Sequence, residues 1–142
     1  MKLQEIMTKD PIRIHPKERL EVAARLMTQY NIGMLPVCTA DGKLRGVVTD
    51  RDLVTRGMAA GKMPGQTPVE QVMTPGVTVG QPEMETSAAA ALMGRMQVRR
   101  LPVVEDGLLR GMVSLSDLAV RQETEPDAAE ALAEISSNVS YR

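Results

Sequence analysis

Two short stretches of the sequence place a hydroxyl residue three positions before an aspartate, directly after a run of apolar residues. Residues 46–53 read Gly-Val-Val-Thr-Asp-Arg-Asp-Leu, and residues 111–118 read Gly-Met-Val-Ser-Leu-Ser-Asp-Leu. We interpret each stretch as a strand that runs into a helix, whose free N–H groups and dipole attract a phosphate beside the hydroxyl. The aspartate, one turn further along, can accept two hydrogen bonds from a ribose diol. Together the pair suits the sugar and phosphate of a nucleotide.

The same pattern also has a purely structural interpretation. A hydroxyl residue followed three positions later by an acidic residue is a capping box, here with Asp in place of the usual Glu or Gln. Thr49 with Asp52, and Ser114 with Asp117, would then do no more than cap a helix. A single copy does not separate the two interpretations, and the repetition of the pair favours the nucleotide-binding one.

The rest of the chain repeats in the same order. The matching segments are 66 residues apart up to the second strand of the repeat and 65 apart after it. These segments are Ile6-Met7-Thr8 with Val72-Met73-Thr74, Pro16 with Pro82, Leu35-Pro36-Val37 with Leu101-Pro102-Val103, and Asp41-Gly42 with Asp106-Gly107. Prolines, a hairpin turn and a hydroxyl–Asp pair in one register indicate an internal duplication.

Each repeat has the predicted element order β-α-β-β-α. In the first repeat we expect a strand over 11–14, a helix over 18–30, strands over 35–38 and 44–49, and a helix from Thr49 to about residue 60. Residues 67–70, Thr-Pro-Val-Glu, predict a further capping box that opens a short helix. Gly46 and Gly111 are expected to start the third strand of each repeat, where the backbone passes close to a neighbouring segment.

The predicted fold class is α/β, in the α+β sense, with two β-α-β-β-α repeats. Each repeat would form a three-stranded sheet with two helices on one face. The other face needs a cover, so we expect the sheets to pack on each other about a pseudo-twofold axis, with clefts between the repeats. The expected division is 1–60 for repeat 1, 61–71 for a linker and short helix, 72–122 for repeat 2, and 123–142 for a C-terminal helix and tail.

The polar C-terminal segment predicts one more helix, opened by Glu125 and Pro126. Its apolar face would consist of Ala128, Ala131, Leu132 and Ile135. Because this stripe is narrow and rich in alanine, we expect the helix to dock on its own module or on a partner subunit.

The composition excludes several classes of function. The formal net charge is −1 at pH 7, which gives no electrostatic reason to bind DNA or a membrane surface. The sequence contains no Phe and no Trp, so a base-stacking surface for single-stranded nucleic acid is not expected. No apolar run reaches transmembrane length and the N-terminus has no signal region, so we expect a cytoplasmic protein.

Catalytic and metal chemistry are not expected either. Acid–base catalysis needs a positioned histidine, a carboxylate pair or a metal ion. His15 is the single histidine and is expected on the surface, while Cys38, the single cysteine, is expected to be a small core residue. No metal-binding cysteine spacing is present. We therefore expect a protein that is not an enzyme and has no catalytic cofactor and no metal site.

These residues and their order resemble the tandem cystathionine β-synthase (CBS) domain pair, or Bateman module. The resemblance rests on the paired Met-Thr segments, the Leu-Pro-Val strands, the Asp-Gly hairpins and the two hydroxyl–Asp stretches, and it covers nearly all of residues 1–122. In that family the clefts between the repeats bind adenosine nucleotides or adenosyl ligands, in a regulatory and not a catalytic role. The resemblance implies AMP, ADP, ATP or an adenosyl compound as the ligand. It also implies a homodimer of two modules that form a flat disc.

The resemblance further implies which residues bind. In the family, the hydroxyl–Asp pair of one repeat generally faces the Met-Thr segment and the loop before Leu-Pro of the other repeat. One cleft would combine Thr49, Arg51 and Asp52 with Thr74, Val77, Val98, Arg99 and Arg100. The other would combine Ser114 and Asp117 with Thr8, Pro11, Ile32, Gly33 and Met34.

The two implied clefts differ in charge. The first carries up to three arginines, whose guanidinium groups can pair bidentately with phosphate. In the second, Gly33 and Met34 stand where the first has Arg99 and Arg100. We therefore predict that a phosphorylated ligand prefers the first cleft, and that the second is weaker, empty or suited to a less charged ligand. The alternative is that both arginines are solvated surface residues.

Two functional hypotheses remain after the enzyme is set aside. The leading hypothesis is an adenosine-ligand sensor that regulates an unknown partner protein in trans, since the sequence shows no attached effector domain. The alternative is a structural dimerisation or interaction module that binds no ligand, in which the hydroxyl–Asp pairs are helix caps and nothing more.

Overall fold

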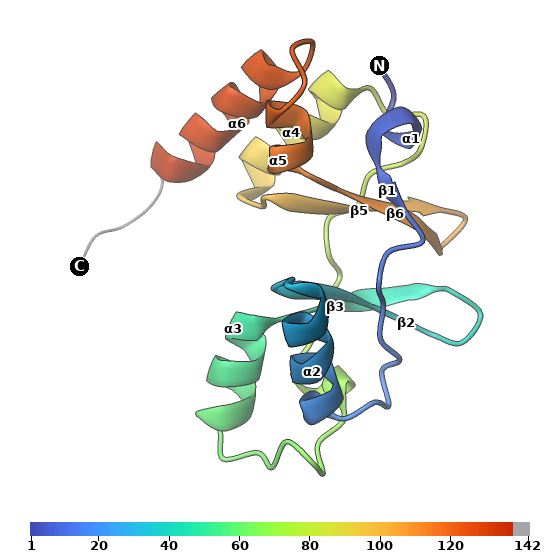
Figure 1. The fold of residues 1–142 in the computed structure, drawn as a ribbon, viewed down its shortest axis with the longest axis vertical. Helices are drawn as coiled ribbons and strands as arrows, with labels where there is room; N and C mark the ends of the chain where they lie inside the picture. Colours follow the sequence, from blue (N-terminus) through green and yellow to red (C-terminus); the bar gives the residue numbers. More distant parts are fainter. Residues whose placement is uncertain (138–142) are drawn as a thin grey trace. The chain divides into compact units, whose positions relative to one another are not determined.

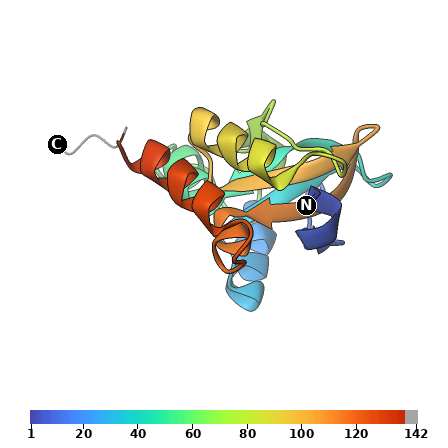
Figure 2. The ribbon, with the colours of Figure 1, turned by 90° about the horizontal axis from the view of Figure 1, so that it is seen from above.

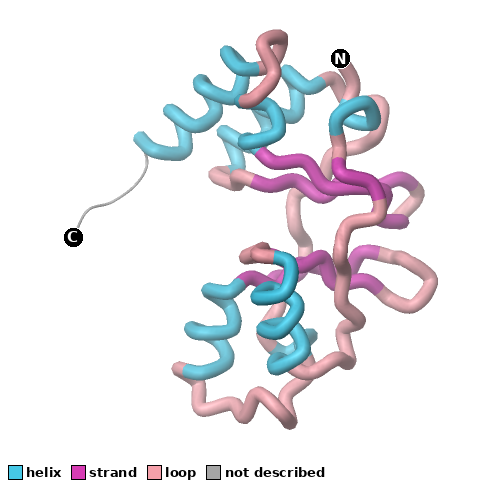
Figure 3. Tube along the Cα trace, viewed as in Figure 1, coloured by secondary structure: helices cyan, strands magenta, loops and turns pink. Residues whose placement is uncertain are grey.

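The computed structural model describes residues 1–137, and the chain divides into two compact units (Figures 1 and 3). Unit 1 comprises Met1–Pro11, Thr78–Asp106 and, of the described chain, residues 110–137. Unit 2 comprises Ile12–Val77 and Gly107–Leu109. Each unit contains a three-stranded sheet and several helices, which confirms the mixed α+β class.

The sheet of unit 2 has the strand order β2-β3-β4, with antiparallel neighbours throughout. Its strands are β2 (Met34–Cys38), β3 (Leu44–Thr49) and β4 (Thr74–Pro75). The helices of this unit are α2 (Leu20–Tyr30), the short α3 (Asp50–Asp52), the π-helix η1 (Leu53–Met58) and the 3₁₀-helix η2 (Val69–Gln71). Its buried core consists of Ile14, Leu20, Ala23, Met27, Leu35, Val37, Val48, Val69 and Val72.

The sheet of unit 1 has the strand order β1-β6-β5, from β1 (Thr8–Lys9), β5 (Arg100–Glu105) and β6 (Leu108–Ser114). Its helices are α1 (Leu3–Ile6), α4 (Thr86–Met96), α5 (Leu115–Ala119) and α6 (Glu125–Ser137). Helix α6 packs against α4 and α5, and Figure 2 shows it beside α4. Ala128, Ala131 and Ile135 are buried there, whereas Leu132 stays 42% exposed. The C-terminal helix therefore docks on its own module.

The two repeats exchange their first short strands. β1 opens the first repeat but pairs with β6 of the second, and β4 opens the second repeat but pairs with β3 of the first. Glycines permit this close pairing, because a Cβ atom at Gly46 would lie 2.5 Å from the carbonyl oxygen of Thr74 and one at Gly111 would lie 2.8 Å from that of Thr8. The expected close approach is confirmed, although both glycines lie within their strands and not at the start.

Two predicted local structures are wrong. Residues 11–14 form no extended strand, because only Ile14 pairs, in an isolated parallel bridge with Val37. Residues 67–70 form no capping box, because the hydroxyl of Thr67 donates to the carbonyl of Met63 at 2.8 Å and Pro68 precedes η2 without a side-chain cap. In both places proline-rich loop geometry overrides the local pattern.

Candidate functional site

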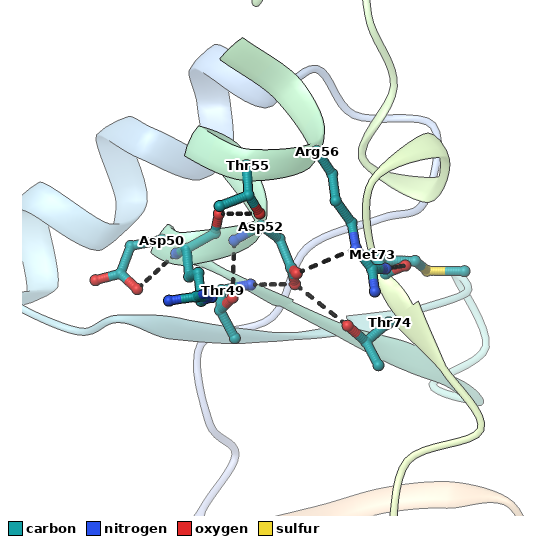
Figure 4. A network of polar contacts seen from close by, with 8 residues as sticks. Thr49, Asp50, Asp52, Thr55, Arg56, Met73 and Thr74 are labelled. Carbon is teal, nitrogen blue, oxygen red and sulfur yellow. Dashed lines mark hydrogen bonds and ion pairs between the residues drawn. The ribbon is translucent and has the colours of Figure 1, made fainter. Parts of the chain in front are cut away.

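Thr49 and Asp52 form a reciprocal pair at the junction of β3 and α3 (Figure 4). The backbone N–H of Thr49 donates to Oδ2 of Asp52, and the backbone N–H of Asp52 donates to Oγ1 of Thr49, both at 3.0 Å. This geometry is a capping box, so the structural interpretation of the pattern correctly describes the helix start. The Thr49 hydroxyl still has its own O–H to donate.

Asp52 has two further neighbours within unit 2, and its residue is only 8% exposed. The hydroxyl of Thr74, at the start of β4, donates to Oδ2 of Asp52 at 3.4 Å, while Nε of Arg56 lies 3.8 Å from Oδ1. The exchange of β4 thus brings Thr74 to the aspartate, as Figure 4 shows. Since a carboxylate has about four lone-pair sites, Oδ1 keeps the capacity to accept hydrogen bonds from a diol.

Arg56 is a residue of this site that the sequence reasoning missed. Its Nη1 donates to the carbonyl of Met73 at 3.2 Å, so the side chain bridges Asp52 and the segment that enters β4. The side chain is 52% exposed, so its guanidinium group is accessible to an anion from solvent. The spacing of four residues between Asp52 and Arg56 on one helical segment is the signal that could have identified it.

Ser114 and Asp117 form the same reciprocal pair in unit 1, at the junction of β6 and α5. The N–H of Ser114 donates to Oδ2 of Asp117 at 2.8 Å, and the N–H of Asp117 donates to Oγ of Ser114 at 3.1 Å. Thr8, the counterpart of Thr74, is exposed in β1 and pairs with Met112. Among residues 1–137, Asp117 has no ion pair like that of Asp52 with Arg56.

Arg99 and Arg100 are exposed at the start of β5, in the same unit as Ser114. The carbonyl of Arg99 accepts a hydrogen bond from the N–H of Leu115 at 2.9 Å, which places the arginine pair beside the start of α5. A cavity of about 490 Å³ lies there. Its lining residues are Arg99, Arg100, Ser114, Leu115, Ser116, Ala119, Glu125, Ala128, Ala129 and Leu132. The grouping of these arginines with Thr49 and Asp52 stays a prediction.

The remaining predicted residues divide between the units. Arg51 is exposed in α3, and Val77 is half-buried after β4. Gly33 accepts a hydrogen bond from the N–H of Asp50 at 2.9 Å and so holds the loop before β2 against the start of α3. Besides Val77, the half-buried residues of this remaining group are Pro11 and Val98 in unit 1, and Ile32, Gly33 and Met34 in unit 2.

The other residues singled out in the sequence carry no site. His15 is exposed, as predicted. Cys38 is buried, and burial raises the pKa of its thiol despite the nearby Arg13, so it is a core residue with little thiolate. Across residues 1–137, no cluster of three histidine, cysteine or acidic side chains is suited to a metal ion. Nor does any helix in that part of the chain have the length and apolar character needed to cross a membrane.

Comparison with known proteins adds the family context. The pattern of the CBS domain matches the sequence twice, over residues 3–58 and 69–123. The CBS domain-containing protein YhcV of Bacillus subtilis is 41% identical over 134 residues, which cover 94% of each chain.

Two solved structures with bound adenosine compounds have a similar fold. The CBS domain pair of protein MJ0100, in complex with 5′-methylthioadenosine and S-adenosyl-L-methionine, has a TM-score of 0.73 and 27% identity, covering 84% of this chain and 97% of its own. CBSX2 in complex with AMP has a TM-score of 0.71 and 25% identity, covering 93% of this chain and 98% of its own.

Proposed function

Because the chain belongs to the CBS-domain family, as a pair of CBS repeats, we propose that it is a regulatory module that binds an adenosine ligand. The ligand would be AMP, ADP, ATP or an adenosyl compound such as S-adenosylmethionine. The module would have no catalytic activity of its own. It would act in the cytoplasm as a homodimer, and ligand binding would change its affinity for a partner protein regulated in trans. Such coupling requires that the partner distinguish the ligand-bound from the ligand-free state.

The observation that carries this proposal is the surroundings of the Asp52 carboxylate. Oδ2 is engaged by Thr49 and Thr74, while Oδ1 faces only a long ion pair with the half-exposed Arg56. A ribose diol can bind Oδ1 once Arg56 swings away, and the freed guanidinium is then available to a phosphate. The adenosine compounds bound by CBSX2 and by the MJ0100 domain pair support this class of ligand.

The second candidate function is a dimerisation module without a ligand. The capping geometry of both hydroxyl–Asp pairs favours it, because each aspartate already accepts the backbone N–H of the residue that caps its own helix. In that case the clefts would be vestigial and Asp52 would serve only to fix α3 to β4.

Thermal unfolding in the presence of ligands separates the two candidates. AMP, ADP, ATP, S-adenosylmethionine and 5′-methylthioadenosine would each be added, with GMP as the matched control. A ligand at a hundred times its Kd stabilises the fold by about 2.7 kcal/mol. For a chain of 142 residues this raises Tm by roughly 5–10 °C. We expect this rise with at least one adenosine compound and none with GMP.

An unchanged Tm with every adenosine compound would contradict the sensor and support the dimerisation module. An equal rise in Tm with GMP would instead indicate a site that recognises only the phosphate and ribose and does not distinguish the bases. Mass spectrometry of small molecules that copurify with the protein would identify the natural ligand directly.

The arginine pair provides a second test. Arg100→Glu is expected to weaken the binding of AMP by at least about ten-fold, because a charge-assisted phosphate contact is replaced by repulsion. Binding of 5′-methylthioadenosine, which has no phosphate, should change much less. Arg95→Glu, an equal change of charge at an exposed position of α4, is the control. Unchanged AMP affinity in Arg100→Glu would mean that the arginine is a solvated surface residue.

A further inference from the structure

Arg56 lies beside the oxygen of Asp52 that a ribose diol would use. Its Nε is 3.8 Å from Oδ1, and its Nη1 donates to the carbonyl of Met73 at 3.2 Å (Figure 4). The other oxygen, Oδ2, already accepts the backbone N–H of Thr49 and the hydroxyl of Thr74. A ligand that binds Oδ1 must therefore displace the guanidinium group.

The two partners of this ion pair are held with different firmness. The Asp52 side chain is 11% exposed and is fixed by its capping box, whereas the Arg56 side chain is 52% exposed. Water screens a pair with one partner this exposed, so the pair itself contributes little to stability. The guanidinium can therefore leave Oδ1 while the carboxylate stays in place.

The cost of displacing Arg56 depends on the charge of the ligand. A phosphate accepts hydrogen bonds from the displaced guanidinium, so the arginine exchanges one anionic partner for another. Adenosine and 5′-methylthioadenosine have no phosphate and leave the guanidinium without an anionic partner. S-adenosylmethionine has a sulfonium cation at the 5′ position, where a nucleotide has its phosphate, and like charges repel each other.

The second repeat has the same residue type at the equivalent position but not the same contact. Arg121 follows Asp117 by four residues, as Arg56 follows Asp52. In unit 2 the helical backbone continues from α3 into η1, which contains Arg56, whereas α5 ends two residues before Arg121. Within residues 1–137, Arg121 makes no ion pair with Asp117. The contact with Asp52 thus depends on the helix geometry of unit 2 and not on spacing alone.

We propose that Arg56 selects ligands by charge at the Asp52 site. A phosphorylated adenosine ligand replaces the carboxylate as the partner of the guanidinium, and it is preferred over adenosine, 5′-methylthioadenosine and S-adenosylmethionine. This inference rests on the proposed function, because it requires that the Asp52 site bind an adenosine compound. It uses contacts within unit 2 alone, so it does not depend on the predicted contribution of Arg99 and Arg100.

Calorimetric titration with AMP and with 5′-methylthioadenosine tests the proposal. The full-length Asp117→Ala variant is the starting protein, because its unit 1 pair has lost the carboxylate and only the Asp52 pair is complete. Adding Arg56→Gln should weaken the binding of AMP by about ten-fold or more, since a charge-assisted hydrogen bond to phosphate is lost. The same change should strengthen the binding of 5′-methylthioadenosine by about two-fold, because no guanidinium has to be displaced.

Two further variants separate selection by charge from a structural role of Arg56. Arg56→Lys keeps the charge and should retain most of the preference for AMP. Arg121→Gln is the matched control, since it removes the same charge at the equivalent position of unit 1, and it should leave both affinities unchanged.

A change of both affinities in the same direction in Arg56→Gln would overturn the proposal, because a purely structural role affects both ligands alike. An unchanged ratio of the two affinities, or an equal effect of Arg121→Gln, would overturn it as well. In each of these cases AMP still binds the wild type and the proposed function stands. A wild type that binds no adenosine compound would contradict the proposed function, and this inference with it.

Discussion

Asp52 and Asp117 occupy equivalent positions in the two repeats but have different surroundings. Both close a capping box with the hydroxyl residue before them. Asp52 is 8% exposed and also contacts Thr74 and Arg56, whereas Asp117 is only half-buried. The same side chain therefore links three segments in unit 2 and mainly caps a helix in unit 1.

This difference predicts unequal costs of substitution. Asp52→Ala should lower the free energy of unfolding by roughly 1–3 kcal/mol, because it leaves the Thr49 N–H without its partner and removes the contacts with Thr74 and Arg56. Asp117→Ala, its matched control, should cost about 1 kcal/mol or less, the value of a helix cap alone. Urea unfolding of both variants measures the difference. Equal losses would show that the additional contacts of Asp52 contribute nothing to stability.

In the strand pair β3–β4, the two-residue strand β4 can pack against β3 because Gly46 has no side chain. β4 has no apolar alternation and offers little surface of its own. Its position depends on Gly46. The carbonyl of Thr74 lies so close to this glycine that a Cβ atom there would clash with it. That approach in turn fixes the Thr74 hydroxyl against Asp52.

Gly46→Ala should therefore displace β4. We expect a loss of about 1–3 kcal/mol in the free energy of unfolding, because the clash is with backbone and no side chain can move aside. Amide hydrogen exchange at Thr74 should also become faster. Gly65→Ala is the control, since its added Cβ meets only the flexible side chain of Glu21, at 3.4 Å. Similar behaviour of the two variants would mean that β4 does not depend on Gly46.

The internal repeat and most elements could be predicted because their signals are local. Helix α2 follows from apolar residues at helical spacing, and the hairpins follow from Asp-Gly turns in both repeats. The helix starts at Thr49 and Ser114 follow from capping chemistry. Each of these depends on residues close in sequence, so a pattern is enough to indicate them.

The features that could not be predicted depend on segments far apart in the chain. Of residues 11–14, where a strand was expected, only Ile14 pairs, and it forms a single bridge with Val37. The ion pair of Arg56 and its bond to Met73 require the position of β4. The cavity beside Arg99 depends on α6, which lies outside the repeat.

At the scale of the whole molecule, the duplication is symmetric in its sheets and asymmetric in its helices. Each unit has one sheet, one exchanged strand and one hydroxyl–Asp pair. Only unit 1 has an added helix on its helical face, within residues 1–137. The asymmetry means that α6 covers the helices of unit 1, whereas the helices of unit 2 have no such cover among the described residues.

The exchanged strands also constrain how the polypeptide reaches its native state. During synthesis, Thr8 emerges early, but its partner Met112 is among the last residues of the second repeat to leave the ribosome. The N-terminal segment therefore stays unpaired until the second repeat has been synthesised almost to its end. A gene fragment that encodes either repeat alone would yield a sheet without its third strand, so each repeat needs a strand from the other to complete its sheet.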